Sequence, residues 1–190
     1  MFRRTFLAAG TATAILVAPA FAASYTIDPT HSFVAFETGH LGFSRLPGRF
    51  NKLSGTLNYD PAGTPADQSV KVVIDTASLD TNHAERDKHL RSADFFDVGK
   101  FGRATFESTA FEGGPEGGTV KGNLSFMGLT KEIAFPIKLI GAGKDPWGSE
   151  RVGFEGEYTL TRADWGMDYD LGPPARDVKV RLLIEAIKDK

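Results

Sequence analysis

Histidine is the residue type in this chain best suited to metal binding and acid–base chemistry. The 190 residues contain four histidines: His31, His40, His83 and His89. His83 and His89 lie six positions apart, whereas two imidazoles on one helical face need a separation of about four. No group of His, Asp and Glu has the spacing of a structural zinc site. The sequence therefore predicts no metal site. We expect the histidines at the surface, with His40 as a candidate polar end to an interior cavity.

A second group with chemical potential is the set of carboxylates near Arg86, namely Asp75, Asp80, Asp87 and Asp94. Paired carboxylates do acid–base chemistry when their pKa values diverge, but carboxylates beside an arginine more often cap helices and form ion pairs. The chain has no cysteine, no G-x-S-x-G nucleophile motif and no glycine-rich phosphate loop before a helix. We therefore expect no catalytic residue and no cofactor, and the protein is predicted not to be an enzyme.

Apolar residues recur at every second position through most of the chain, which is the period of a strand with one buried face. Such runs occupy residues 33–40, 53–59, 70–75, 104–109, 120–126, 132–139, 151–162 and 178–185. This alternation is typical of antiparallel sheets. Long strands with short turns favour an up-and-down barrel over a sandwich. The residues from Phe50 to Tyr59 are predicted as one long strand, with a bulge or bend because Phe50 and Leu53 are out of parity.

One stretch breaks the strand pattern. The residues from Asn82 to Arg91 lack β-branched side chains, and Asn82 and Glu85 are spaced like a capping box. The sequence therefore predicts a short helical insertion that covers one mouth of the barrel, with Leu90, Phe95 and Phe96 facing inward. The predicted fold is all-β, an eight-stranded antiparallel barrel with this insertion.

The inward face of the predicted strands mixes large and very small side chains. The large ones include Phe36, Phe106, Phe126, Phe135 and Phe154, and the small ones are Gly55, Ala104, Ser108, Gly122, Gly156 and Ala186. Small inward residues leave space for an apolar ligand, since a barrel of about eight strands holds one small ligand or fills with side chains. Alternatively, the glycines let strands bend closely past each other and the aromatics fill the core. The residue pattern leaves both interpretations open.

The first 22 residues have the pattern of a secretory signal peptide. Arg3 and Arg4 precede an uncharged apolar stretch from Phe6 to Val17, and small residues follow up to Ala22. We expect cleavage near Ala22 and a single domain over residues 23–190. The adjacent arginines leave general secretion and twin-arginine export both open. The charge balance, 22 basic against 24 acidic residues, gives no support to a nucleic-acid binder.

Several segments, in order, resemble one family. They include Tyr25–Ser32, His40–Gly42, Gly48–Phe50, Asp75–Thr81, Arg86–Asp97, Ala104–Ser108, Gly122–Leu124, Gly128–Lys131 and Arg162–Met167. The chain is identified from them as a member of the YceI-like, polyisoprenoid-binding proteins over residues 25 to about 187. The segment 86–97 is the most specific part of the match. Trp165 departs from the family, in which Phe is commoner at this position.

The resemblance implies a lipocalin-like barrel in the periplasm that holds an isoprenoid, a quinone or another long apolar lipid. It also implies a membrane redox partner and a homodimer as partners to be tested. The expected cavity-lining residues are Phe36, His40, Phe43, Phe50, Phe96, Phe106, Phe126, Phe135, Phe154 and Trp165. Two alternatives remain: a periplasmic enzyme that uses His31, His40 or the region of Asp80 and Asp87, and a stress-related structural barrel that is fully packed.

Overall fold

The structure is a computed structural model that describes residues 22–190. The predicted signal peptide lies outside the described residues, except for Ala22. The chain order of the elements is β1 (Ala23–Ile27), β2 (Phe33–His40), β3 (Ser44–Phe50), β4 (Leu53–Tyr59), η1 (Pro65–Asp67), β5 (Ser69–Asp75), η2 (Thr76–Ser78), β6 (Leu79–Asp80), α1 (Ala84–Leu90), β7 (Arg103–Gly114), β8 (Gly117–Phe126), β9 (Leu129–Lys144), β10 (Glu150–Thr161), η3 (Arg162–Trp165), η4 (Pro173–Ala175) and β11 (Asp177–Lys188). The elements labelled η are short 3₁₀ helices.

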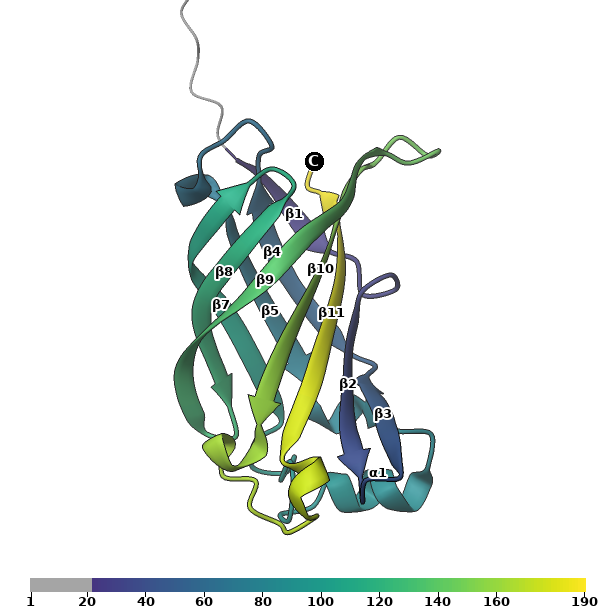
Figure 1. Cartoon of the computed structure of the whole chain (residues 1–190). Helices are drawn as coiled ribbons and strands as arrows, with labels where there is room; N and C mark the ends of the chain where they lie inside the picture. Colours follow the sequence, from purple (N-terminus) through teal and green to yellow (C-terminus); the bar gives the residue numbers. More distant parts are fainter. Residues whose placement is uncertain (1–21) are drawn as a thin grey trace, which may run out of the picture.

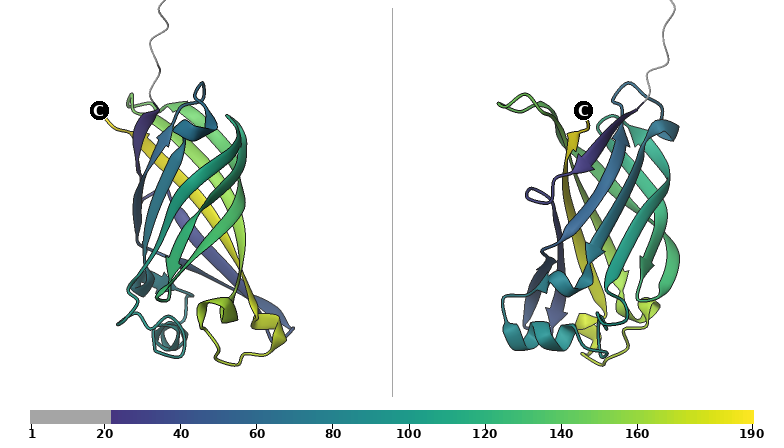
Figure 2. Two further views of the ribbon diagram at one scale, coloured as in Figure 1. Left: turned by 90° about the vertical axis from the view of Figure 1, so that its left-hand side faces the viewer. Right: turned by 180° about the vertical axis from the view of Figure 1, so that it is seen from behind.

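Eight antiparallel strands close into a barrel in the order β1-β4-β5-β7-β8-β9-β10-β11, and β11 pairs back onto β1. Figure 1 shows the strands tilted around one axis, and the two views of Figure 2 show the barrel closed on its other sides. This confirms the antiparallel eight-stranded barrel that the sequence predicts. Closure pairs the edges that an open sheet would leave exposed.

The strand β11 has two successive partners on one side, which is where the barrel departs from a simple meander. Its C-terminal part pairs with β1, in the register Ile27↔Ala186. Its N-terminal part pairs with β2, in the register Phe33↔Leu183. The strands β2, β3 and β6 extend the sheet at the end of the barrel that carries α1. We call this the lower end, and the end with the β4–β5, β7–β8 and β9–β10 turns the upper end.

The single strand predicted from Phe50 to Tyr59 is wrong, because the ladder stops between β3 and β4. The backbone N–H groups of Asn51 and Lys52 leave the barrel ladder and donate to the backbone oxygen and to Oγ of Ser78, at 3.0 Å each. The chain bends there, as the change of parity between Phe50 and Leu53 predicts. This bend lets β3 pair with β6 while β4 continues in the barrel.

The predicted helical insertion is present, but its start was assigned to the wrong residue. The helix α1 begins at Ala84, and the imidazole Nδ1 of His83 accepts the N–H of Arg86 at 3.2 Å. Asn82 adopts a left-handed conformation with φ of 62°, which an asparagine tolerates better than most residues. Asn82 therefore makes the turn into the helix, and His83 caps it. Figure 2 shows α1 beneath the lower end of the barrel, across from η3 and η4.

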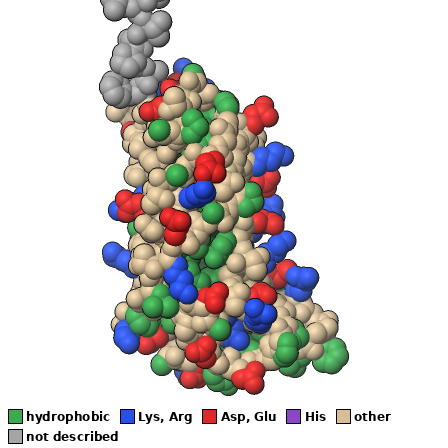
Figure 3. All heavy atoms as spheres, turned by 60° about the vertical axis from the view of Figure 1, so that its left-hand side comes forward, with side chains coloured by type: hydrophobic (Ala, Val, Ile, Leu, Met, Phe, Trp, Pro, Cys, Tyr) green, Lys and Arg blue, Asp and Glu red, His purple; other side chains and the backbone are tan. Residues whose placement is uncertain are grey.

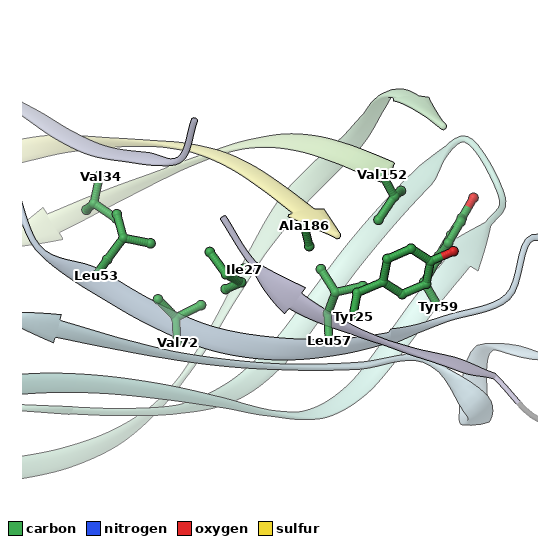
Figure 4. Packing of buried hydrophobic residues seen from close by; sticks show 9 residues of the cluster. All are labelled: Tyr25, Ile27, Val34, Leu53, Leu57, Tyr59, Val72, Val152 and Ala186. Carbon is green, nitrogen blue, oxygen red and sulfur yellow. The ribbon is translucent and has the colours of Figure 1, made fainter. Parts of the chain in front are cut away.

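The most deeply buried side chains of the eight barrel strands lie where β1, β10 and β11 meet. They are Ile27, Val152 and Ala186, which are 2%, 1% and 0% exposed. Figure 4 shows these side chains pointing toward one another with Leu57 and the Tyr25 ring. Gly55 borders this region, since a Cβ there would lie 2.9 Å from Cδ1 of Ile27 and 2.0 Å from the backbone oxygen of Lys71 on β5. We call this region, defined by Tyr25, Ile27, Leu53, Val152 and Ala186, the β1 seam.

The outer surface carries interspersed charges of both signs, as the face in Figure 3 shows. Many are cross-strand pairs, such as Lys71 with Glu107 on β5 and β7 and Lys179 with Glu157 on β11 and β10, each at 3.2 Å. Exposed pairs of this kind add little stability, but they keep much of the outer surface polar; Phe33 on β2 and Ile140 on β9 are exposed apolar exceptions. Within residues 22–190, no helix combines the length and the apolar character needed to cross a membrane.

Candidate binding cavity

The candidate functional site is an interior cavity of about 300 Å³ that follows the barrel axis. It is bounded at the lower end by Leu90 and Leu171, and at the upper end by Pro61 and Pro115. Ligand pockets of roughly 300–1,000 Å³ are usual for small molecules. Aliphatic side chains form much of the wall: Val34, Leu57, Val70, Val72, Ile74, Val120, Leu124, Ile133, Ile137, Leu160, Val178, Val180, Leu182 and Ile184. The interior is therefore hollow and predominantly apolar.

Seven of the ten predicted site residues line this cavity: Phe36, Phe50, Phe96, Phe106, Phe126, Phe135 and Phe154. Four of them form a continuous row of rings. Phe50 lies 5.5 Å from Phe36 and 5.6 Å from Phe96 between ring centroids, and Phe96 lies 5.9 Å from Phe126. These are the tilted and edge-on geometries that aromatic pairs prefer. The row carries the apolar wall from β2 through β3 and the helical insertion to β8.

Three of the predicted residues do not line the cavity. His40 lies on the predicted face of β2, but it pairs with Ser44 at the end of the β2–β3 hairpin, where it is exposed. Phe43 is 89% exposed in the turn of that hairpin. Trp165 is 2% exposed, and its ring lies behind Phe126 at 5.6 Å. Strand parity predicts the face of a residue but not the point at which the strand leaves the barrel.

The small inward residues divide into two groups. Ala104, Ser108 and Gly156 line the cavity and leave space, as one interpretation predicts. Gly122 instead makes room for the Phe106 ring, since a Cβ there would lie 2.6 Å from its Cζ atom. Together with Gly55 and Ala186 at the β1 seam, Gly122 follows the alternative interpretation, in which small residues permit close approach.

Phe111 is a lining residue that the sequence reading missed. The pairing of β7 with β8 shifts between Ser108 and Ala110, so one extra residue reverses the parity. Phe106, Ser108 and Phe111 therefore all face inward. Phe111 and Phe106 are an odd number of residues apart, and only knowledge of the bulge could have placed both on one face.

Tyr158 and Arg162 also line the cavity at its lower end and were not predicted to do so. Both follow the inward parity of β10, which starts with Val152 and Phe154 in the sequence pattern. Strand parity could have placed Arg162 inward, although an arginine is rarely expected to face an apolar interior. Among the described residues 22–190, Arg162 is the only basic residue in the wall.

None of the four histidines lines the cavity. His89 lies at the lower end, with Nε2 at 3.0 Å from Oδ2 of Asp94 and its ring packed edge-on against Phe95 and Tyr169. The alternative in which His31 or His40 acts on a ligand inside the barrel therefore has no geometric support.

The carboxylates around Arg86 have structural contacts. Asp87, which is buried, accepts the Thr81 N–H at 2.9 Å and the Thr81 hydroxyl at 2.5 Å. Arg86 donates through Nε to the Thr81 hydroxyl and through a terminal nitrogen to the Thr81 carbonyl, both at 2.7 Å. Asp80 accepts the N–H of Asn82 at 2.8 Å. These bonds fix the turn between β6 and α1, and so fix the insertion below the barrel.

The structure assembles one polar cluster that no sequence spacing reveals. Asp28, His31 and Glu185 bring three ligand-type atoms within 4.8 Å of one another, although Glu185 is remote in the chain. The guanidinium of Arg151 already lies between the two carboxylates, at 2.9 Å from Asp28 and 2.6 Å from Glu185. Asp145, on the β9–β10 hairpin, accepts from Nε of the same arginine at 2.7 Å. The Arg151 guanidinium therefore occupies the position that a metal ion would take between these carboxylates.

The electrostatics of this cluster follow from its hydrogen bonds. Burial on its own would raise the pKa of Asp28, but bonds from Thr30, His31 and Arg151 outweigh burial and hold that pKa far below its usual range. Bonds to Asp145, Asp28 and Glu185 raise the pKa of Arg151 further above its ordinary value. The cluster lies outside the cavity and joins the β1–β2 bend to β10 and β11.

Comparison with known proteins gives consistent matches. The family model described as "YceI-like domain" matches residues 25–186. A UPF0312 protein of Pseudomonas paraeruginosa is 46% identical over 99% of this chain and 100% of its own length, and one of Yersinia enterocolitica is 45% identical over 100% of both.

Solved structures share the fold. The YceI protein of Campylobacter jejuni has a TM-score of 0.71 and 28% identity, covering 80% of this chain and 90% of its own. A polyisoprenoid binding domain from Saccharophagus degradans has a TM-score of 0.69 and 17% identity, covering 88% and 99%.

Proposed function

Because the chain belongs to the YceI-like family, we propose that it is a binding protein that holds one long apolar lipid inside its barrel. The observation that carries this proposal is the cavity of about 300 Å³, whose walls are aliphatic and aromatic side chains. A fully packed structural barrel would not contain it.

The chemistry of the walls sets the class of ligand. Each 100 Å² of apolar ligand surface removed from water contributes about 2.5 kcal/mol, so an acyl or prenyl chain in this cavity gains affinity along its whole length. A polar or highly charged ligand would lose its hydration against the rings of Phe106 and Phe135 without compensation. The cavity therefore favours a chain-like hydrocarbon.

The cargo that we propose is an isoprenoid, a quinone or another long lipid. The domain from Saccharophagus degradans that shares the fold is described as polyisoprenoid binding, which supports this class. The signal-like residues 1–22 support export to the periplasm. In that compartment the protein would carry its lipid to or from the membrane, and a membrane redox protein and a second copy of the chain are the partners we propose.

Binding without catalysis is the better interpretation of the side-chain geometry. The histidines lie outside the cavity, and the hydroxyl of Ser108, which does line it, accepts the N–H of Val70 at 2.8 Å. A serine nucleophile needs a base within hydrogen-bond reach, and Ser108 has a backbone donor there instead. We propose that lipid is bound and released chemically unchanged.

A charge in the wall tests the proposal. Phe106→Asp places a carboxylate in the cavity, while the matched variant Thr105→Asp places one on the neighbouring outward position of β7. We expect wild-type protein and Thr105→Asp to bind a polyprenol equally, and Phe106→Asp to bind it at least about 100-fold more weakly. Circular dichroism and urea unfolding verify that each variant is folded. Undiminished polyprenol binding by folded Phe106→Asp would contradict the proposal.

A further inference from the structure

The two ends of the cavity differ in their polar chemistry. At the upper end, the amide of Gln68 is bonded at both its atoms to the backbone of Asp60, at 3.2 and 2.8 Å. The Tyr59 hydroxyl donates to the Pro115 carbonyl at 3.2 Å, and its ring packs edge-on against Phe154 at 5.3 Å. The polar side chains of Gln68 and Tyr59 are therefore already paired with backbone groups at this end.

At the lower end the wall contains a cation. Arg162 is the first residue of η3, and its guanidinium donates to three backbone carbonyls, those of Ala175 at 2.8 Å, Tyr169 at 3.0 Å and Met167 at 3.4 Å. A guanidinium has five N–H donors and stays protonated at every physiological pH. Three neutral carbonyls therefore leave about two donors unbonded. The carboxylates of Asp168 and Asp170 lie close enough to act on the charge of Arg162, but within residues 22–190 neither forms an ion pair with it.

Tyr158 adds a second donor on the same side. Its ring faces the cavity between β9 and β11, 6.3 Å from Phe135 between centroids. Its hydroxyl makes no hydrogen bond to any side chain or backbone group of residues 22–190. Burial raises the pKa of this phenol, and the carboxylate of Asp164 in η3 acts in the same direction, so the hydroxyl remains a protonated donor near the lower end.

We propose that the lower end of the cavity is a subsite for an anionic, oxygen-rich head group, with Arg162 and Tyr158 as its donors. A lipid phosphate and a lipid carboxylate share this chemistry. The inference rests on the proposed function: the apolar chain extends upward along the phenylalanine wall, and the head remains between α1 and η3, where Figure 2 shows the two lower segments on opposite sides. Arg162 thus has two roles: it anchors the loop from η3 to η4, and it binds the anionic head group of the ligand.

Chain-matched ligands test this proposal. Palmitate is compared with hexadecanol, and geranylgeranyl phosphate with geranylgeraniol, by competition for the cavity of the wild-type protein. We expect the anion of each pair to bind about tenfold more tightly, which corresponds to about 1.4 kcal/mol, and the ratio to fall as salt is raised. An equal or higher affinity for the alcohols would overturn the proposal. If no member of either pair binds, the proposed function fails instead.

Two variants locate the site. Arg162→Gln is expected to reduce the preference for the anion to less than about twofold, whereas Arg181→Gln, on the outer face of β11 beside Glu155, should leave it unchanged. Since Arg162 also anchors a loop, Tyr158→Phe provides a variant with no bond to lose: we expect it to weaken anion binding by about fivefold and alcohol binding by less than twofold. A preference that persists in both variants would overturn the assignment.

Discussion

Two walls of the same barrel use apolar residues in opposite ways. Around the β1 seam, Ile27, Val152 and Ala186 are at most 2% exposed, and Gly55 allows neighbouring backbones to touch. On the wall made by β7, β8 and β9, Phe106, Phe126 and Phe135 are 6–8% exposed and line the cavity. Side chains of the β1 seam are packed against protein on all sides and stabilise the fold. Side chains of the cavity wall lack protein contacts on the side that faces the cavity.

The difference shows how a small barrel combines stability with a hollow interior. Interiors are normally packed as densely as organic crystals, so a cavity must be compensated elsewhere. Here the compensation is the β1 seam together with the cluster around Arg151, which joins the ends of β10 and β11 to the β1–β2 bend. The phenylalanine wall is then available for a ligand.

The same substitution on the two walls should give the largest difference. Ile27→Ala in the β1 seam is expected to lower the free energy of unfolding by about 2–5 kcal/mol. Ile133→Ala on the cavity wall should cost roughly half as much, because part of its surface already lacks protein contacts. Urea unfolding of both variants measures the two values. Equal costs would show that the walls are packed alike.

Replacing a valine by phenylalanine on each wall tests whether free space is present beside it. Val152→Phe has no free space in the β1 seam and should lower the free energy of unfolding by about 1–3 kcal/mol. Val180→Phe extends into the cavity, so its cost should stay within about 1 kcal/mol while binding of a long polyprenol weakens by about tenfold. Thermal unfolding and lipid titration separate these outcomes. If Val180→Phe binds the long lipid normally, the ligand does not occupy this part of the cavity.

Low pH should reduce the free energy of unfolding through protonation of Asp28, which lies in the cluster around Arg151 next to the β1 seam. The pKa of this carboxyl is lower in the folded protein than its value of about 3.9 in an unfolded chain. Its contribution to stability is therefore complete above about pH 5 and is lost as the pH falls toward the folded-state pKa. Asp28→Asn should cost about 1–3 kcal/mol at pH 7, and its deficit should shrink by pH 3.

The matched control for this prediction is Asp94→Asn, which removes an exposed carboxylate paired with His89. Urea unfolding at pH 7, 5, 4 and 3 gives the profile of each protein. A deficit in Asp28→Asn that is the same at pH 3 and pH 7 would mean that the Asp28 charge does not stabilise the fold.

The smallest effects are expected at two residues that the sequence placed in the cavity and the structure places outside it. His40→Ala and Phe43→Ala should each change the free energy of unfolding by less than about 0.5 kcal/mol and leave polyprenol affinity within about twofold of wild type. Isothermal titration tests both. A clear loss of affinity in Phe43→Ala would extend the binding site to the β2–β3 hairpin.

The sequence predicts most of the barrel because alternation is local: each predicted run shows its apolar face within six to twelve residues. The strand β1 (Ala23–Ile27) is not among these runs. It also predicts most of the phenylalanine wall, since Phe106, Phe126 and Phe135 follow from parity alone. Phe111 was missed because the bulge in β7 leaves no local mark. The error at Phe43 has a different origin: this residue lies in the β2–β3 turn, and strand parity does not show where a hairpin extends beyond the barrel.

The cluster of Asp28, Arg151 and Glu185 marks the limit of sequence reasoning more clearly. Its members come from the start, the middle and the end of the domain, and only closure of β11 onto β1 brings them together. The cavity itself is a similar case: whether small inward residues leave space or are filled by a neighbour depends on three-dimensional packing, as Ser108 and Gly122 show.

The central claim is that the cavity holds a lipid, and native mass spectrometry tests it most directly. The protein is released gently from the cells that produce it and weighed intact, then weighed again after denaturation. We predict an excess mass in the native protein that disappears on denaturation and matches a prenyl or acyl lipid. No excess mass, together with no binding of added polyprenol or geranylgeranyl phosphate, would contradict the account.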